Sequence, residues 1–510
     1  MLAKVLSAAV VGVDARLVEV ECDVAGGEPR FDTVGLPELS VREARVRVRS
    51  AIRHAGLPFP FTRVTVNLAP ADVRKDGTCF DLPVALAVLA ADGHLPAEDL
   101  RGWVVVGELS LTGAVRPVCG VLAVAEMARN LGLRGVICAT GNVLEALAVS
   151  GVDVRAAETL GEVVRLLRDR ADWPAMPEAP PVRRVPHALC WSDVRGHSLA
   201  RRALEVAAAG GHNAVMTGTP GTGKTMLARR LPTILPPLAP AEAIEVTKVH
   251  SVAGLLPNGT GLLTERPFRA PHHTASATAL VGGGSTPKPG EVSLAHRGVL
   301  FLDELAEFPR HVLETLRQPL EDGQVIVTRT RQVVRFPAQV MLIAALNGCP
   351  CGHVGSTVHR CVCTPVALER YRSRLSGPLL DRIDIQIQLQ PLTSAMLRHS
   401  PPGETSAVVQ ARVCAARQVQ ARRYAGLAGD TNALVSMPAL RNLSPLQPAV
   451  HDLLLRALEQ FGLSPRAHDR IWRVARTIAD LESATDIGAE HIAEALQYRH
   501  FDEPAVPLAA

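Results

Sequence analysis

The alternation of apolar and polar positions divides the chain into three folded parts and one linker. Over residues 1–172, strand-like and helix-like runs alternate, which predicts a compact mixed α+β domain. Residues 173–188 hold five prolines and almost no periodic pattern, as expected of a linker. Over residues 189–393, strand-like runs are separated by helical segments, which indicates a parallel α/β sheet with crossovers. Residues 394–510 are almost wholly helical and are predicted to form a lid.

Composition and charge narrow the class of protein. The chain has 510 residues, of which 47% are hydrophobic, ample for several cores. Its formal net charge is only +4, so any nucleic-acid-binding surface must be local. No apolar run approaches the roughly eighteen residues that span a bilayer, and the first residues continue into strand-like alternation. We therefore expect a cytoplasmic protein with no membrane anchor. Six scattered cysteines are expected to be small buried residues: Cys22, Cys79, Cys119, Cys138, Cys190 and Cys414.

One segment matches the phosphate-binding pattern G-x-x-x-x-G-K-[ST]. It follows a strand-like run at 213–217 and precedes a helix-like run at 226–231, which is the order that the motif requires. Lys224 is expected to neutralise the β and γ phosphate oxygens, and Thr225 to hold Mg²⁺. The motif predicts ATP and Mg²⁺ as cofactors, held by Gly218, Thr219, Pro220, Gly221, Thr222, Gly223, Lys224 and Thr225.

Two carboxylates follow a second buried strand about eighty residues later. Asp303 ends the apolar run 298–302 and is predicted to be a further Mg²⁺ anchor. Glu304 is placed to polarise the attacking water, which favours hydrolysis over binding alone. Asn347 ends the next strand-like run and is predicted to align that water, although an Asn at a strand end is also a common capping residue.

Two arginines are candidates for stabilising the transition state. Arg382 is placed where it could reach the nucleotide of a neighbouring subunit, with Arg374 as its nearest competitor. The alternative is an intramolecular ion pair with Asp381 or Asp384. In the lid, Ser464 opens a helix with arginines at 466, 470, 473 and 476, one of which should face the phosphates. Arg466 lies nearest the edge of the lid, and the other arginines can form a solvated face.

Four cysteines form two C-x-C pairs separated by nine residues: Cys349, Cys351, Cys361 and Cys363. Four soft ligands close together suit zinc, and they would leave no open position for catalysis. The C-x-C spacing is tighter than the usual C-x-x-C, so a reduced loop cluster is the alternative. The pattern predicts at most a structural Zn²⁺ site.

Several long strings then resemble one known family. Residues 266–274, 282–284, 289–296, 303–304, 376–385 and 473–481 are similar to the ComM/YifB group of magnesium-chelatase-like AAA+ ATPases. The resemblance implies a homo-hexameric ring with a helix-2 insert around 250–295 and a pre-sensor hairpin. It also implies that Arg382 acts across a subunit boundary.

The expected hairpin has strands over residues 324–328 and 332–336. In related rings its tip points into the central pore, where Arg329 and Arg331 would bind DNA phosphates without reading sequence. A solvent-exposed hairpin with no DNA contact is the alternative. His272 and His273 are adjacent, and on an extended segment they should point to opposite faces.

Residues 106–117 resemble the Lon-protease-like branch of the ribosomal S5 domain 2 fold. A protease of that branch needs a Ser nucleophile and a Lys base. Here Cys79 occupies the nucleophile position and the base position has no lysine, so proteolysis is not expected. A helix over residues 41–54 carries five arginines, and either a DNA-facing surface or a solvated face accounts for them.

We therefore expect an ATP-driven motor on DNA. By resemblance, it is a hexameric branch-migration helicase that acts on branched DNA or single-strand/double-strand junctions in homologous recombination during natural transformation. A chelatase-like subunit that remodels a protein partner is the alternative. A protein-unfolding ATPase would need an aromatic pore loop, and the expected hairpin tip offers arginines instead.

Overall fold

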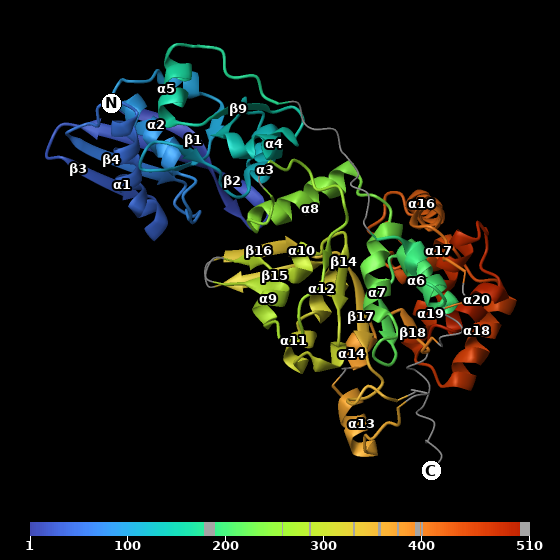
Figure 1. The fold of residues 1–510 in the computed structure, drawn as a ribbon. Coiled ribbons are helices and arrows are strands. Elements are labelled where there is room, and N and C mark those ends of the chain that lie inside the picture. The colour runs from blue at the N-terminus through green and yellow to red at the C-terminus, as the bar shows by residue number, and fades with distance from the viewer. Residues whose placement is uncertain are drawn as a thin grey trace.

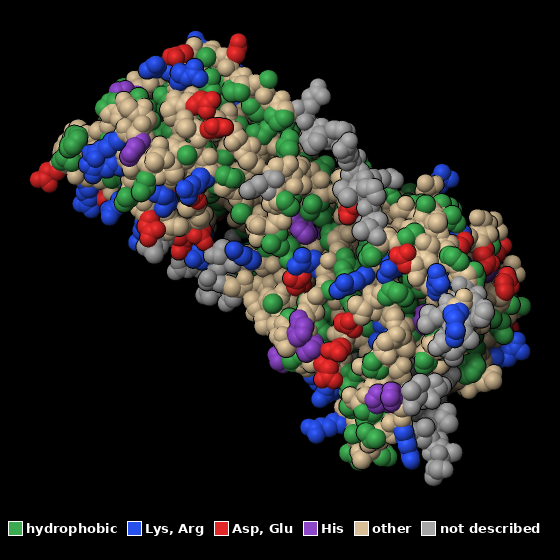
Figure 2. All heavy atoms as spheres, viewed as in Figure 1, with side chains coloured by type: hydrophobic (Ala, Val, Ile, Leu, Met, Phe, Trp, Pro, Cys, Tyr) green, Lys and Arg blue, Asp and Glu red, His purple; other side chains and the backbone are tan. Residues whose placement is uncertain are grey.

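The structure, a computed structural model, describes residues 1–177, 189–257, 259–284, 287–329, 332–354, 359–374, 377–392, 398 and 401–499. These residues form a mixed α/β molecule with two large sheets, three two-stranded sheets and a helical C-terminal part (Figure 1). Charged side chains of both signs are spread over the surface that Figure 2 shows. Most of the predicted linker lies outside the described residues.

A seven-stranded mixed sheet organises the N-terminal domain. In spatial order its strands are β3 (Arg30–Val34), β4 (Arg63–Ala69), β2 (Asp14–Ala25), β1 (Leu2–Val11), β5 (Trp103–Val105), β8 (Gly135–Ala139) and β9 (Asp153–Ala157). Two short strands, β6 (Glu108–Leu109) and β7 (Val115–Arg116), pair beside it.

Helices cover both faces of this sheet around β5 and β8, whose residues are all buried, whereas β2 and β4 alternate buried with more exposed residues. On one face α1 (Leu39–His54), α2 (Asp81–Ala91) and α5 (Leu160–Arg168) pack in one core. On the other face α3 (Val121–Asn130) and α4 (Val143–Leu147) pack in a second core. Every residue of α2 is buried, which explains its lack of a polar face.

A five-stranded parallel sheet forms the centre of the second domain. Its order is β11 (Phe268–Arg269), β14 (Val299–Leu302), β17 (Met341–Leu346), β10 (Ala214–Thr217) and β18 (Ile385–Gln388). All residues of β14 and β17 are buried, as expected for strands covered on both faces.

The two faces of the parallel sheet contact different elements. One face packs against α6 (Ser198–Gly210), α7 (Lys224–Arg230) and the C-terminal helices. The other packs against α9 (Ala277–Val281), α10 (Glu291–Leu294), α11 (Arg310–Glu314), α12 (Arg317–Asp322) and the antiparallel hairpin of β15 (Gln324–Arg329) and β16 (Gln332–Pro337). Two further short strands pair as β12 (Gly282–Gly283) and β13 (Lys288–Pro289), and α13 (Pro365–Arg372) and α14 (Gly377–Leu380) precede β18.

The lid shares its core with the parallel sheet. It contains α16 (Ser406–Arg423), α17 (Met437–Leu443), α18 (Pro448–Phe461), α19 (Pro465–Leu481) and α20 (Ala489–Leu496). Buried Asp480 on α19 accepts hydrogen bonds from Arg423 and Arg476 and from Asn432 Nδ2 at 2.9 Å. This network ties three segments of the lid together.

Helix α8 (Pro240–Val252) joins the two domains. Lys248 Nζ lies 2.7 Å from Glu126 and 2.8 Å from Asp14, both in the N-terminal domain. Ser251 donates a hydrogen bond to the buried carboxylate of Glu145, whose pKa is raised by desolvation. Charged and polar contacts therefore fix the N-terminal domain against the domain of the parallel sheet.

The predicted mixed fold with a parallel sheet is confirmed, and the predicted hairpin strands pair as Thr328↔Val333. The expectation for the scattered cysteines was partly wrong. Cys22 and Cys138 are buried, but Cys119 is exposed, because it lies in a loop at the domain boundary. Among the described residues, no helix combines the length and the apolar character that a membrane span needs.

Candidate active site

The predicted phosphate loop lies between β10 and α7, at the carboxyl end of the central strands. Gly221 and Gly223 have φ values of +80° and +87°, a backbone conformation that residues with a Cβ rarely adopt. Thr222 Oγ1 donates to the Thr219 carbonyl at 2.8 Å and closes the loop on itself. The glycines therefore permit the tight turn that directs backbone N–H groups toward a phosphate.

Lys224 is buried at the centre of this loop. Its Nζ donates to the carbonyls of Gly218 (2.6 Å) and Thr219 (3.0 Å) and to Asn347 Oδ1 (3.1 Å). Burial lowers the pKa of the Lys224 ammonium, while Asp303 and Glu304 oppose that shift. A bound anion would replace the carbonyls as the partner of this charge.

The structure brings the predicted Mg²⁺ ligands together. Thr225 Oγ1 donates to Asp303 Oδ2 at 2.8 Å. Asp303 follows β14, and Asn347 follows β17, the strand between β14 and β10. The hydroxyl and the carboxylate are oxygen ligands of the kind that Mg²⁺ takes beside substrate phosphates, and these two residues would hold it. Bound there, the ion would neutralise charge on the phosphate oxygens.

Glu304 is held in an unusual conformation next to the site. Its backbone has φ +52°, and its N–H donates to Asp303 Oδ1 at 3.0 Å. Left-handed backbone is costly for a residue with a side chain, and such strain is often found at active sites. The turn directs the Glu304 side chain away from Asp303 and toward the insert that follows α8.

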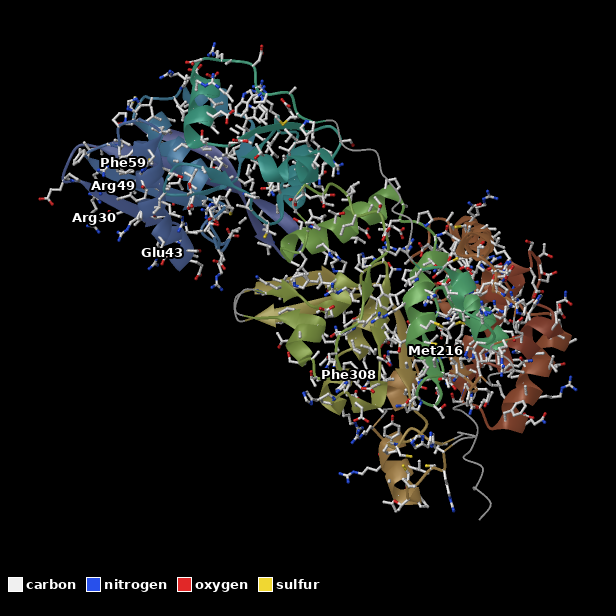
Figure 3. All side chains as sticks on the ribbon, in the orientation of Figure 1. Arg30, Glu43, Arg49, Phe59, Met216 and Phe308 are labelled. Carbon is white, nitrogen blue, oxygen red and sulfur yellow. The ribbon has the colours of Figure 1, made fainter. Side chains whose placement is uncertain are left out.

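That insert supplies a residue that the sequence analysis left without a role. His273 Nδ1 lies 3.2 Å from Glu304 Oε2, and the His273 ring packs edge-on to Phe308 (labelled in Figure 3) with centroids 6.4 Å apart. The expectation that His272 and His273 point to opposite faces was wrong. Their rings lie side by side, tilted by 32° with centroids 4.1 Å apart, because a turn begins at His273 in place of an extended strand.

The cysteine cluster lies directly against the phosphate loop. A Cβ on Gly352, between the two cysteine pairs, would lie 2.8 Å from Pro220 Cγ, so only glycine permits this approach. Tyr371 on α13 is buried against the backbone of Asn347, and burial raises the pKa of its hydroxyl to about 12. The segment after Asn347 is therefore packed between the nucleotide site and α13.

The four cysteine sulfurs are placed as a tetrahedral metal site requires. Sγ distances are 3.3 Å for Cys349–Cys351, 3.6 Å for Cys351–Cys361 and 3.7 Å for Cys361–Cys349, and all four ligand atoms lie within 4.8 Å of one another. Zn–S bonds of about 2.3 Å would place tetrahedral sulfurs roughly 3.8 Å apart, close to these values. The donor set, Cys349, Cys351, Cys361 and Cys363, fits a structural zinc ion.

The two predicted arginines lie at the opposite edge of the sheet. Arg382 and Asp381 come just before β18, whose residue Ile385 pairs with Ala214 at the amino end of β10. Asn213 Nδ2 donates to the Arg382 carbonyl at 2.9 Å, which fixes this edge. The phosphate loop follows the other end of β10. Arg382 therefore does not face the nucleotide of its own subunit.

The side chains at this edge form ion pairs that the sequence analysis did not anticipate. Arg382 pairs with Glu321 on α12. Arg466 pairs with Asp381, so it also lies away from the subunit's own phosphates. Arg374 is different: its guanidinium donates to the Ala306 carbonyl at 3.2 Å, on the same side as Glu304.

The other lid arginines have structural partners. Arg476 is fully buried on Asp480, and Arg473 donates to the Ala433 carbonyl. Arg470 Nη2 lies 3.7 Å from Asp381 Oδ1. The predicted DNA contacts fall at the hairpin tip, where Arg331 and the side chain of Arg329 lie outside the described residues.

Cys79, at the position of a protease nucleophile, is partly buried. Desolvation raises the pKa of its thiol to about 12, so the thiol is protonated at neutral pH. Lys75 donates to the carbonyls of Gly35 (3.1 Å) and Pro70 and serves the local fold. The chemistry of this domain does not support a thiolate nucleophile.

Comparisons with known proteins agree with this geometry. Family models of subunit ChlI of magnesium chelatase match residues 20–142 and 190–397, and a model of its C-terminal part matches residues 403–499. The fold and the phosphate site thus define a magnesium-chelatase-like AAA+ ATPase, a class that uses ATP and Mg²⁺.

Relatives at higher identity narrow the class. The chain is 45% identical to competence protein ComM of Haemophilus influenzae, over 98% of this chain and 97% of that protein. It is 43% identical to YifB of Escherichia coli, over 98% and 97% of the two chains. The magnesium-chelatase 38 kDa subunit of Rhodobacter capsulatus is 25% identical over 26% of this chain and 41% of its own length. The chain belongs to the ComM/YifB family.

Proposed function

We propose that this protein is an ATP-driven DNA motor, a hexameric branch-migration helicase that acts in homologous recombination during natural transformation. The observation that carries the proposal is the 45% identity to a competence protein over nearly the full length of both chains. A chain this similar to a competence protein over nearly its full length is expected to serve the same process. Branched DNA and single-strand/double-strand junctions are the proposed substrates, in the cytoplasm.

The finer fold assignment follows the same logic. We assign the N-terminal domain to the Lon-protease-like S5 domain 2 fold, without protease chemistry. The ATPase domain is the AAA+ type with a helix-2 insert, which here spans the region from α8 to α10. Hairpin β15–β16 is the pre-sensor hairpin, and its tip would carry Arg329 and Arg331 to DNA phosphates in the pore.

A ring gives the arginines at the far edge of the sheet a function. Arg382 and Arg466 lie at the amino ends of the strands, whereas Lys224 and Glu304 lie at the carboxyl ends. In a head-to-tail ring, one edge of each subunit meets the other edge of its neighbour. Arg382 would then leave Glu321 and stabilise charge on the neighbour's nucleotide.

The chemistry of one catalytic cycle follows from the site. Lys224 and the loop N–H groups orient the phosphates, and Asn347 and Glu304 position the water for in-line attack. Glu304 accepts the water proton only after its side chain leaves His273. Through this contact with Glu304, the position of the insert and the position of the adjoining hairpin would be coupled to ATP hydrolysis.

A chelatase-like subunit that remodels a protein partner is the second candidate, supported by the match to the magnesium-chelatase family models. The similarity to the chelatase 38 kDa subunit covers only 26% of this chain, so this candidate has less support. It predicts ATP hydrolysis that depends on a partner protein and is indifferent to DNA.

The test compares ATP hydrolysis with and without DNA, and strand displacement from a forked duplex and a four-way junction. The expected result is DNA-stimulated hydrolysis together with ATP-dependent displacement, both abolished in Lys224→Ala. Hydrolysis that DNA does not stimulate at low salt, with no displacement, would refute the motor. The Arg329→Ala, Arg331→Ala double variant separately tests the hairpin, because unimpaired displacement would remove only that assignment.

A further inference from the structure

A cleft of about 920 Å³ lies on the N-terminal domain, remote from the ATP site. It is bounded by α1, by the start of β3 and by the segment that precedes β4. In Figure 3, the labelled Arg30, Arg49 and Phe59 gather at one end of this domain, far from Phe308 beside the ATP site. Nothing in the ATPase chemistry uses this cleft.

The cleft is strongly basic although the whole chain is nearly neutral. Four arginines and one aspartate line it, Arg30, Arg45, Arg49, Arg53 and Asp32, an excess of three positive charges with His54 neutral. Arg30 pairs with Asp32 at 2.8 Å. Within the described part of the chain, the other three form no ion pair with a carboxylate. Figure 2 shows Lys and Arg side chains gathered over this end of the domain.

The four-residue spacing of α1 produces this basic face. Residues 45, 49 and 53 lie one helical turn apart and are all exposed, while the alternate face of α1 is buried in the core. Arg47 points elsewhere and pairs with buried Asp81 at 2.6 Å. Glu43, also labelled in Figure 3, is exposed on α1 but does not line the cleft.

Aromatic side chains alternate with these charges. Phe31 and Phe59 stack with ring centroids 6.2 Å apart, and the Arg49 guanidinium lies 5.6 Å from the Phe59 centroid. Phe61 is 73% exposed at the mouth of the cleft. Three of the ten phenylalanines of the chain line this one site. The combination of aromatic side chains and these arginines in one cleft suits a ligand that has both flat apolar faces and negative charges.

We propose that this cleft binds single-stranded DNA, with a base stacked on Phe61 and phosphates on Arg45, Arg49 and Arg53. Aromatic faces beside arginines are the features that hold unpaired bases without reading sequence. A duplex keeps its bases stacked internally and offers only phosphates. An acidic peptide would use the arginines and leave Phe61 without a partner. The inference rests on the proposed function, because it gives a DNA motor a second place to hold a displaced strand.

The test measures how tightly a labelled oligo-dT of twenty nucleotides binds to the full-length protein in the absence of ATP. Binding is followed by fluorescence anisotropy over a range of salt concentrations. Phe61→Ala should weaken binding about tenfold, since one stacked base contributes that much. The double variant Arg49→Ala, Arg53→Ala should reduce the slope of log affinity against log salt by about 1.4. Matched controls are Leu111→Ala, an exposed apolar residue of the same domain, and Arg101→Ala, an exposed arginine outside the cleft.

The outcomes separate this inference from the motor itself. The proposed DNA-binding role of the cleft is overturned if the cleft variants bind oligo-dT as tightly as the control variants do. It is also overturned if the protein binds duplex and single-stranded DNA with equal affinity. Competition by polyglutamate as effective as by unlabelled oligo-dT also overturns it, because the site would then be a surface for acidic peptides. DNA-stimulated hydrolysis with binding independent of Phe61 refutes only the cleft. Binding that depends on Phe61, without DNA-stimulated hydrolysis, refutes only the motor.

Discussion

Complementation between two inactive variants tests the subunit boundary most directly. Lys224→Ala removes the charge that holds the phosphates, and Arg382→Ala removes the arginine from the opposite edge of the sheet. Each variant alone should lose at least about a thousandfold in ATP hydrolysis, the usual effect of losing an arginine that stabilises phosphoryl transfer. If the two residues serve one nucleotide from different subunits, a mixture should recover activity.

The magnitude of recovery follows from the head-to-tail arrangement. In a ring assembled from equal amounts of the two variants, each nucleotide site combines one subunit's loop with its neighbour's arginine. About one boundary in four then joins an intact Lys224 to an intact Arg382, so roughly a quarter of wild-type hydrolysis should return. Residues that act within one subunit cannot produce this effect, because neither variant has a complete site of its own.

The assay is steady-state phosphate release after the two variants are mixed, dissociated and reassembled, at fixed total protein. Arg374→Ala provides the matched control, because Arg374 lies beside Ala306 on the same side as the subunit's own Glu304. A mixture of Lys224→Ala with Arg374→Ala should show no more hydrolysis than its Arg374→Ala subunits give alone. Recovery with Arg374→Ala but not with Arg382→Ala would show that the wrong arginine was assigned. If neither mixture recovers activity, the proposal that Lys224 and Arg382 serve one nucleotide from different subunits is refuted.

Three further results are expected. His273→Ala should change the rate of ATP hydrolysis by a few fold and leave the affinity for ATP unchanged, because the 3.2 Å contact between His273 and half-exposed Glu304 is partly solvated. An altered Kd for ATP would show that His273 acts in nucleotide binding instead. Asp480→Asn should lower the free energy of unfolding by about 3–5 kcal/mol, because it leaves the buried guanidinium of Arg476 without its carboxylate partner. Denaturant titration measures this free energy, and a change below about 1 kcal/mol would contradict the expected effect. Cys363→Ser should lower the zinc content of the purified protein and its melting temperature together, and an unchanged metal content would remove the zinc site.

The chemistry of the phosphate loop was predictable because it is contiguous. Eight successive residues form the turn through their own backbone, so Gly218 to Thr225 carry their arrangement with them. The cysteine pairs are similarly local, since short loops bring Cys349 and Cys351 to Cys361 within a single connection. The meeting of Asp303 and Asn347 was also predictable, because the carboxyl ends of neighbouring parallel strands lie at one edge of the sheet. This arrangement brings both residues to the phosphate loop.

The sequence by itself determined the phosphate loop, the four-cysteine cluster and the hairpin strands, because each depends on local backbone geometry or on short-range periodicity. Only the tertiary structure decided that His273 meets Glu304, that Arg382 pairs with Glu321 and that Gly352 lies against Pro220. These contacts join segments separated by tens of residues, so they depend on the path of the chain. The basic cleft has the same origin: the spacing of α1 aligns its arginines, but the fold alone brings Phe31, Phe59 and Phe61 beside them.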